Sequence, residues 1–303
     1  MLLLKKRRLG NSELYVSELG LGCMSLPADK REASEIIETA LEAGINFFDT
    51  ADLYGGGRNE QLLGNLLTTK RDQIILATKV GNQMNSDGSS WTWNPSKEHI
   101  MKAVKDSLLR LGTDYIDLYQ LHGGTMEDNA EDAIDAMETL KKEGMIRQYG
   151  ISSIRPNVIE RFLKKSAAVS VMMQYSLLDR RPEEWFKMIS DFGVSIITRG
   201  TLAKGFLTMD GLQRAEKSDG FGTYSANDLY KTLTMLNKKT EDIHAASIAF
   251  NLTQPVVSSV LVGASSKKQL LDSIVSYERE MDNTVIEDLK NTVRQDRYQE
   301  HRV

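Results

Sequence analysis

The strongest constraint on the fold of this chain is a regular alternation between short β-branched runs and amphipathic segments. In residues 29–44, apolar side chains recur at the three- and four-residue spacing of a single helix face. Asp29 and Glu32 have the spacing of a capping box at the start of that helix, and Gly44 is placed to end it. Residues 45–48 then predict a strand, and the same pair of patterns repeats along the chain.

Eight strands are predicted in this way. They lie at residues 19–24, 45–48, 73–79, 115–122, 145–152, 169–174, 194–199 and 258–263. Eight strands alternating with helices in 303 residues are typical of an α/β chain folded as a (β/α)8 TIM barrel. The alternative, a doubly wound open sheet, usually has fewer strands per domain. The barrel is therefore the predicted fold.

Segments outside the eight repeats predict three additions to the barrel. A β-hairpin within residues 7–16 is expected to close the amino-terminal end, and an extra helix is expected at the carboxy terminus. Residues 210–225, which contain three glycines, are expected to form a mobile loop at the carboxy-terminal face. Because no linker, repeat or low-complexity tract interrupts the pattern, residues 1–303 are predicted to form a single barrel domain.

Composition narrows the class of partner and the compartment. Acidic side chains number 42 and basic ones 38, and the resulting charge of −4 argues against a dedicated nucleic-acid binder. The single cysteine, Cys23, fits a reducing compartment and is expected to be buried rather than redox-active. The apolar start is too short for a secretory signal, and polar residues interrupt the uncharged stretch 244–266. We therefore expect a cytoplasmic protein with neither a nucleic-acid nor a membrane partner.

Polar residues at the predicted strand ends indicate where function resides. Active sites of such barrels lie at the carboxyl ends of the strands. Taken singly, Asp49 could cap a turn, Lys79 could be a solvated strand end, and His122 could be an ordinary barrel histidine. Three ionisable groups of different kinds at one face favour an active site instead. The predicted rim residues are Met24, Asp49, Lys79, His122, Ser152, Gln174, Arg199 and Gly263.

Tyr54, five residues beyond Asp49, is a candidate proton donor. A phenol normally titrates near a pH of about 10, so it needs help to act near neutrality. A lysine ammonium about 4 Å away favours the phenolate by up to about 4 kcal/mol at an effective dielectric constant of about 20. Attraction to Asp49 would keep Lys79 charged, and His122 would orient the same carbonyl oxygen. These residues together have the chemistry needed to protonate a carbonyl.

Several motifs resemble the signature of the aldo-keto reductases. They are residues 48–55 (FDTADLYG), 77–80 (ATKV), 114–122 (DYIDLYQLH) and 150–153 (GISS), with further matches at 9–12, 19–24 and 263–270. The resemblance implies a barrel that binds NADPH without a Rossmann domain and reduces aldehydes or ketones. It also implies a catalytic tetrad of Asp49, Tyr54, Lys79 and His122. The sequence also resembles the branch of this family that includes the β subunits of potassium channels.

The start of the last barrel helix has features of an anion site. Ser266 and Gln269 have the spacing of a capping box, and Lys267 and Lys268 occupy the first turn, where the helix dipole disfavours cations. Two solvated lysines are the alternative to a bound anion here. The resemblance places the adenosine 2′-phosphate at this point, which implies a preference for NADPH over NADH.

The resemblance also implies a set of cofactor contacts. In this chain they are Gly22, Met24, Asp49, Ser152, Gln174, Arg199, Gly200, Thr201, Leu202, Lys204, Gly205, Gly263, Ser265, Lys267, Gln269 and Asp272. Ser153 and Ser273 depart from the family, because many members carry asparagine at these positions. Arg199 replaces an aromatic side chain, and its guanidinium could either stack on the nicotinamide or contact a phosphate.

The predicted function is the NADPH-dependent reduction of a small carbonyl compound. The alternatives are an NADPH-sensing regulatory protein with a vestigial reductase site and a Schiff-base lyase that uses Lys79. Residues 83–95 are expected to hold substrate, with Trp91 and Trp93 forming a lid or anchoring that loop. The four histidines lack metal-ligand spacing, so no metal is expected. The oligomeric state is left open, with a monomer favoured.

Overall fold

Eight parallel strands form a closed barrel in the computed structural model, which describes residues 4–85, 88 and 90–302. The barrel strands are β3 (Leu19–Gly22), β4 (Phe47–Asp49), β5 (Ile75–Val80), β8 (Ile116–His122), β9 (Ile146–Ser152), β10 (Ser170–Gln174), β11 (Ser195–Arg199) and β14 (Val257–Gly263). The last strand, β14, pairs in parallel with the first, β3, and so leaves no edge. This confirms the predicted (β/α)8 TIM barrel.

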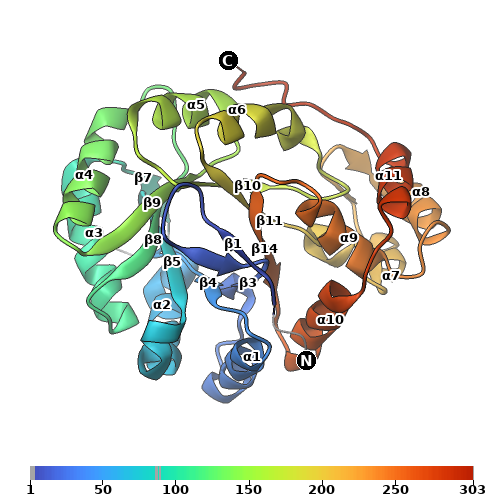
Figure 1. Ribbon diagram of the computed structural model, residues 1–303, viewed down its shortest axis with the longest axis horizontal. Helices are drawn as coiled ribbons and strands as arrows, with labels where there is room; N and C mark the ends of the chain where they lie inside the picture. Colours follow the sequence, from blue (N-terminus) through green and yellow to red (C-terminus); the bar gives the residue numbers. More distant parts are fainter. Residues whose placement is uncertain (1–3, 86–87, 89, 303) are drawn as a thin grey trace.

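Helices surround the barrel and connect its strands (Figure 1). Those between the strands, or directly after the last, are α1 (Lys30–Glu42), α2 (Arg58–Leu67), α3 (Lys97–Leu111), α4 (Ala130–Lys142), α5 (Pro156–Lys165), α6 (Phe186–Asp191), α9 (Ile243–Leu252) and α10 (Lys267–Glu278). The connection between β11 and β14 contains two more helices, α7 (Gly211–Ala215) and α8 (Ala226–Asn237), and α11 (Asn283–Thr292) lies near the carboxy terminus. The extra carboxy-terminal helix is thus present. In the part of the chain that the structure describes, every helix is too short or too polar to span a bilayer.

Local sequence signals account for where the helices begin. The Asp29 carboxylate accepts hydrogen bonds from the backbone N–H groups of Arg31 and Glu32, which confirms Asp29 as the cap of α1, although within the residues described the Glu32 side chain makes no return bond to the Asp29 backbone. The Ser96 hydroxyl accepts from the backbone N–H of His99 at the start of α3. Pro156 occupies the first turn of α5, where its missing N–H has no intrahelical partner to lose.

A separate apolar cluster fills the inside of the barrel. Its members are Leu9, Val16, Phe47, Ile75, Ala77, Leu118, Val169, Met172, Ile197 and Leu261. Successive strand residues point to opposite faces, so alternate residues of each strand line the barrel interior and the others pack against the helices. Leu9 and Val16 come from the amino-terminal hairpin and close the lower end of this cluster.

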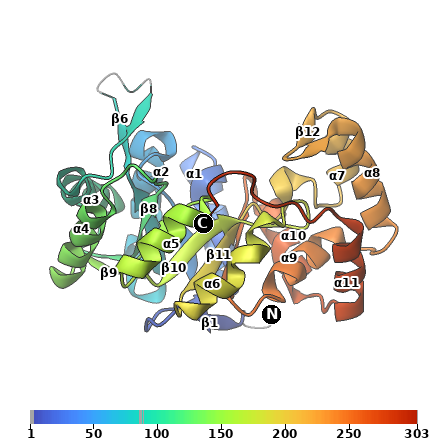
Figure 2. The same ribbon diagram turned by 90° about the horizontal axis from the view of Figure 1, so that it is seen from above.

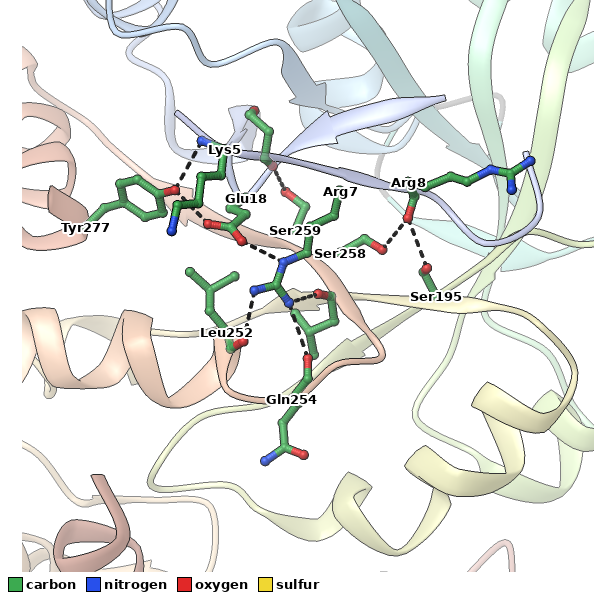
Figure 3. Close-up of polar contacts among 12 residues, drawn as sticks. Lys5, Arg7, Arg8, Glu18, Ser195, Leu252, Gln254, Ser258, Ser259 and Tyr277 are labelled. Atoms are coloured by element: carbon green, nitrogen blue, oxygen red, sulfur yellow. Dashed lines mark hydrogen bonds and ion pairs between the residues drawn. The ribbon is translucent and has the colours of Figure 1, made fainter. Parts of the chain in front are cut away.

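The amino-terminal hairpin consists of β1 (Lys6–Arg8) paired antiparallel with β2 (Tyr15–Ser17), as predicted. Arg7 ties it to the barrel wall: its guanidinium donates to the Glu18 carboxylate at 2.6 Å and to the Val257 carbonyl at 2.8 Å. It also donates to the Leu252 carbonyl at 3.1 Å, so one side chain joins the hairpin to α9 and β14 (Figure 3).

Two segments expected to be loops contain hairpins, and these lie at the end of the barrel opposite the amino-terminal hairpin (Figure 2). Residues 82–93 contain β6 (Asn82–Met84) and β7 (Trp91–Trp93), and residues 210–225 contain α7 followed by β12 (Gly220–Phe221) and β13 (Tyr224–Ser225). The mobile loop at residues 210–225 was predicted from the glycines in that segment. Gly220 instead lies in strand β12, where its φ is +120° and a β-carbon would lie 2.2 Å from the Tyr224 carbonyl oxygen of the paired strand.

Candidate active site

The strand ends bring the predicted polar residues to one rim. Asp49, His122, Ser152, Gln174, Arg199 and Gly263 are the last residues of their strands, and Lys79 is the last but one of β5. Met24 differs, since it follows β3 in a short turn (Cys23–Ser25) and its side chain is 64% exposed. Gly22 takes the strand-end position of β3 instead. Cys23 in the same turn is buried, as expected, and burial raises the pKa of its thiol.

Lys79 is the best-anchored side chain of the site. Its ammonium donates to the Asp49 carboxylate and to the Thr50 carbonyl oxygen, both at 2.7 Å. Its third contact is the Tyr54 hydroxyl at 3.5 Å. Lys79 and Asp49 are buried, so their charges are screened little by solvent. The ammonium is therefore fixed in place and directed at the phenol.

A sharp change of chain direction carries Tyr54 to this position. The chain leaves β4 at Asp49, and the Tyr54 backbone N–H donates to the Ala51 carbonyl at 3.1 Å. Gly55 and Gly56 follow with φ values of +60° and +65°, which favour glycine. The glycine run therefore forms a tight left-handed turn that leads into α2.

Burial controls the ionisation of the phenol and the ammonium. Burial raises the pKa of Tyr54 above its ordinary value, and Lys79 offsets only part of that rise. From the sequence only the effect of the lysine was considered, and in the structure desolvation is the larger effect. Burial would lower the pKa of Lys79, yet Asp49 and Tyr54 raise it overall. At neutral pH the site therefore combines a protonated phenol with a charged ammonium.

His122 lies beside Tyr54 in a neutral state. The two rings are nearly perpendicular, with centroids 6.1 Å apart. Burial, together with the positive charges of Lys79 and Arg199, lowers the pKa of His122 to about 3. Its Nδ1 is buried and has no hydrogen-bond partner among the residues that the structure describes. A neutral imidazole can both donate and accept a hydrogen bond.

Neighbouring side chains hold Gln174 at the ends of β10 and β11. Its amide nitrogen donates to the Asp179 carboxylate at 2.7 Å, and its amide oxygen accepts from Arg199 at 3.2 Å. Ser152, the last residue of β9, is buried, and β9 is the neighbour of β10 in the barrel. Gly200 continues from Arg199 with a φ of +69°, and a β-carbon there would lie 3.2 Å from the Gln174 side chain.

The loop after β11 and the start of α10 carry exposed cations. Arg199, Lys204 and Lys267 are exposed, and within the described ranges none of them forms an ion pair with a carboxylate. Lys268 instead pairs with Asp272 at 2.8 Å. Between these cations, Thr201 is buried and Leu202 half-buried, while Lys204 and Gly205 adopt positive φ values of 57° and 87°. Three unpaired cations near two adjacent strand ends fit an anionic ligand.

The predicted cap of α10 is present with one difference. The Ser266 hydroxyl accepts from the backbone N–H of Gln269, as expected. The Gln269 side chain does not complete the box at Ser266. Its amide oxygen accepts from both the backbone N–H and the hydroxyl of Ser265, at 2.9 and 3.0 Å. Ser265 is therefore held in place directly beside Lys267.

Both serines that depart from the family pattern make contacts within the protein. The Ser153 hydroxyl accepts from the Arg155 backbone N–H at 3.2 Å. Ser273 is buried, and its hydroxyl lies 3.1 Å from His244 Nε2 and donates to the Gln269 carbonyl at 3.2 Å. The indole of Trp93 donates to the Asp128 carboxylate at 2.9 Å and anchors its hairpin, whereas Trp91 is 51% exposed.

Two polar residues of the site were missed by sequence reasoning. Gln120 donates to the second Asp49 carboxylate oxygen at 3.3 Å, and Asp179 holds both Gln174 and Arg181. Gln120 has a signal in the sequence, because it precedes His122 by two residues and so faces the same side of β8. Asp179 has none, because it lies in the connection after β10. In the described part of the chain no cluster of potential ligands has the make-up of a metal site.

Comparison with known proteins identifies the family. A sequence model described as the Aldo/keto reductase family matches residues 18–294. This chain belongs to the aldo/keto reductase family. Its members are oxidoreductases that generally reduce carbonyl groups with NAD(P)H. The tetrad residues predicted from the family resemblance are the ones that lie together in this structure.

Relatives of this aldo-keto reductase match almost its full length. A Bacillus subtilis protein named uncharacterized oxidoreductase YqkF is 48% identical over 99% of this chain and 100% of its own. A Schizosaccharomyces pombe protein named aldo-keto reductase yakc [NADP(+)] is 32% identical over 82% of this chain and 76% of its own. The holo form of aldo-keto reductase AKR11C1 from Bacillus halodurans superposes with a TM-score of 0.93 at 47% identity, covering 99% of this chain and 100% of its own.

Proposed function

We propose that this protein is an NADPH-dependent carbonyl reductase in which Tyr54 donates the proton. One observation carries the proposal: a buried phenol lies 3.5 Å from an ammonium that a buried carboxylate fixes in place. Burial raises the pKa of Tyr54, so the phenol is protonated at neutral pH, which is the form that a proton donor requires.

The roles of the chain's own residues follow from their contacts. NADPH, when bound, supplies a hydride to the carbonyl carbon of an aldehyde or ketone. Tyr54 gives its proton to the carbonyl oxygen, and Lys79 stabilises the phenolate that remains. The neutral imidazole of His122, whose ring lies beside that of Tyr54, provides a hydrogen bond that orients the same oxygen.

The exposed cations supply the binding groups that a dinucleotide requires. Gln174 and Ser152 would hold the nicotinamide amide, and the loop from Gly200 to Gly205 would lie along the pyrophosphate. Ser265 and Lys267 would hold a 2′-phosphate at the amino terminus of α10, where backbone N–H groups also favour an anion. Lys268 and Asp272 would contribute less, because they neutralise each other. The name of the fission-yeast relative, which specifies NADP(+), agrees with this preference.

Neither alternative is favoured by a specific contact. A Schiff-base lyase needs a neutral lysine amine, whereas Lys79 has a raised pKa and three hydrogen-bond contacts. A sensing protein would bind NADPH without turning it over. A cytoplasmic location and a monomeric state stay predictions from the sequence.

A screen of NADPH oxidation against diverse aldehydes and ketones tests the proposal. We expect turnover well above the enzyme-free rate for at least one carbonyl class, and slower turnover with NADH. Tight NADPH binding without turnover across the whole panel would support the sensing alternative and refute the reductase.

A further inference from the structure

One polar side chain lies in an otherwise apolar layer directly below the catalytic rim. This inner layer consists of the inward-facing residues that precede each rim residue by two positions in its strand. The rim residues are Gly22, Asp49, Lys79, His122, Ser152, Gln174, Arg199 and Gly263. The members of the inner layer are Gly20, Phe47, Ala77, Gln120, Gly150, Met172, Ile197 and Leu261. Gln120 is the one amide among glycines and hydrocarbons, and it is fully buried. A buried polar group in an apolar layer needs a reason other than packing.

The hydrogen bonds of Gln120 are incomplete. Its amide nitrogen donates to Asp49 Oδ1 at 3.3 Å, while Lys79 binds the other oxygen of that carboxylate at 2.7 Å. Its own amide oxygen is buried and has no partner among the described residues. An unpaired buried amide oxygen is unfavourable, so packing alone does not account for a glutamine at this position.

We propose that Gln120 is a positioning residue that fixes the Asp49 carboxylate and thereby aims Lys79 at Tyr54. With both carboxylate oxygens engaged, by Gln120 from β8 and Lys79 from β5, Asp49 cannot rotate about its side-chain torsion without losing a contact. Without Gln120 the carboxylate is free to turn, and the ammonium that follows it is no longer held near the phenol. The inference rests on the proposed function, since aiming Lys79 has value only if Tyr54 exchanges a proton.

The charged groups around Tyr54 determine in which direction its pKa changes when Gln120 is lost. The charged and titratable groups that face the phenol are Lys79 from β5, Asp49 from β4, His122 from β8 and Arg199 from β11. Lys79 lowers the pKa of the phenol, Asp49 raises it, and His122 is neutral. A less well-aimed Lys79 stabilises the phenolate less, so loss of Gln120 raises the pKa of Tyr54.

The test compares Gln120→Leu and Gln120→Met with Met172→Leu, a conservative change in the same inner layer. Tyr54 is titrated in the cofactor-free protein by NMR with isotope-labelled tyrosine, and its signal is assigned through Tyr54→Phe. Thermal unfolding and the pH dependence of alcohol oxidation are measured for each variant. Oxidation requires the phenolate, so its profile reports the same ionisation with cofactor bound.

We expect both Gln120 variants to fold, to titrate Tyr54 at higher pH, and to reduce carbonyls about tenfold more slowly. Met172→Leu should change none of these. An unshifted Tyr54 titration, or a shift shared by Met172→Leu, would overturn the inference. A parent protein that reduces no carbonyl refutes the proposed function instead, and the cofactor-free titration still decides the role of Gln120.

Discussion

At the scale of single residues, the site depends on the buried ion pair of Lys79 and Asp49, in which each charge stabilises the other. Lys79→Met leaves the Asp49 carboxylate buried without its cation, which costs about 3 kcal/mol of folding stability in comparable cases. We expect that loss in chemical denaturation, together with a large fall in kcat. The double variant Asp49→Asn/Lys79→Met removes both charges and should recover much of the stability but none of the activity. Recovery of activity would show that the charge on Lys79 is dispensable.

The ionisation of Tyr54 and His122 predicts the pH dependence of reduction. Reduction uses the protonated phenol, whose pKa burial raises, so kcat should fall only as the pH rises through that high value. His122, with a pKa of about 3, should stay neutral and contribute no change between about pH 5 and 8. Steady-state kinetics measure the first effect, and the His122 imidazole NMR signals measure the second. A His122 titration near neutrality would contradict the structure.

At the scale of elements, the amino-terminal hairpin depends on Arg7 for its attachment (Figure 3). Arg7→Ala removes charge-assisted hydrogen bonds to Glu18 and to three backbone carbonyls, and should cost about 2 kcal/mol of stability. Arg31→Ala is a suitable control, because the Arg31–Glu35 pair is exposed and worth less than about 1 kcal/mol. Denaturant unfolding measures both. The kcat of Arg7→Ala should be unchanged, because the hairpin lies at the end of the barrel opposite the rim.

Sequence patterns predicted the regular elements better than the connections. Strands and capped helices follow from periodicity and from residues such as Asp29 and Pro156, whose effects are local. The hairpins at 82–93 and 210–225 were missed because glycine is used both in flexible loops and in tight turns. Only the structure shows that Gly220 meets the Tyr224 carbonyl, or that Arg294 of the carboxy-terminal tail donates to Thr223 and Asp228.

At the scale of the whole molecule, barrel closure decides which residues meet. Asp49, Lys79 and His122 were predictable because each lies at a strand end, and closure of the barrel brings such ends together. The contact between Gln120 and Asp49 was not predictable, since the strands β4 and β8 are separated by β5 and the contact crosses the barrel interior. The net charge of −4 likewise conceals the local cations Arg199, Lys204 and Lys267.

The exposed cations lead to a prediction about the affinities for NADPH and NADH. Lys267→Ala should weaken NADPH binding about tenfold and NADH binding much less, because the 2′-phosphate loses a charge-assisted partner. Lys268→Ala is the matched control one residue away, and its effect should be smaller because Asp272 already neutralises that lysine. Equilibrium titration of cofactor fluorescence measures both affinities. Equal effects of the two substitutions would place the 2′-phosphate elsewhere.

The central claim is that Tyr54 is the proton donor, and its removal tests that claim most directly. Tyr54→Phe deletes one hydroxyl that contacts Lys79 and leaves the cations around the cofactor site unchanged. We predict that kcat for carbonyl reduction falls by a factor of at least about 100, within the usual range for a general acid, while the Kd for NADPH stays close to that of the parent. A Tyr54→Phe variant that binds NADPH normally and keeps most of its turnover would contradict the account.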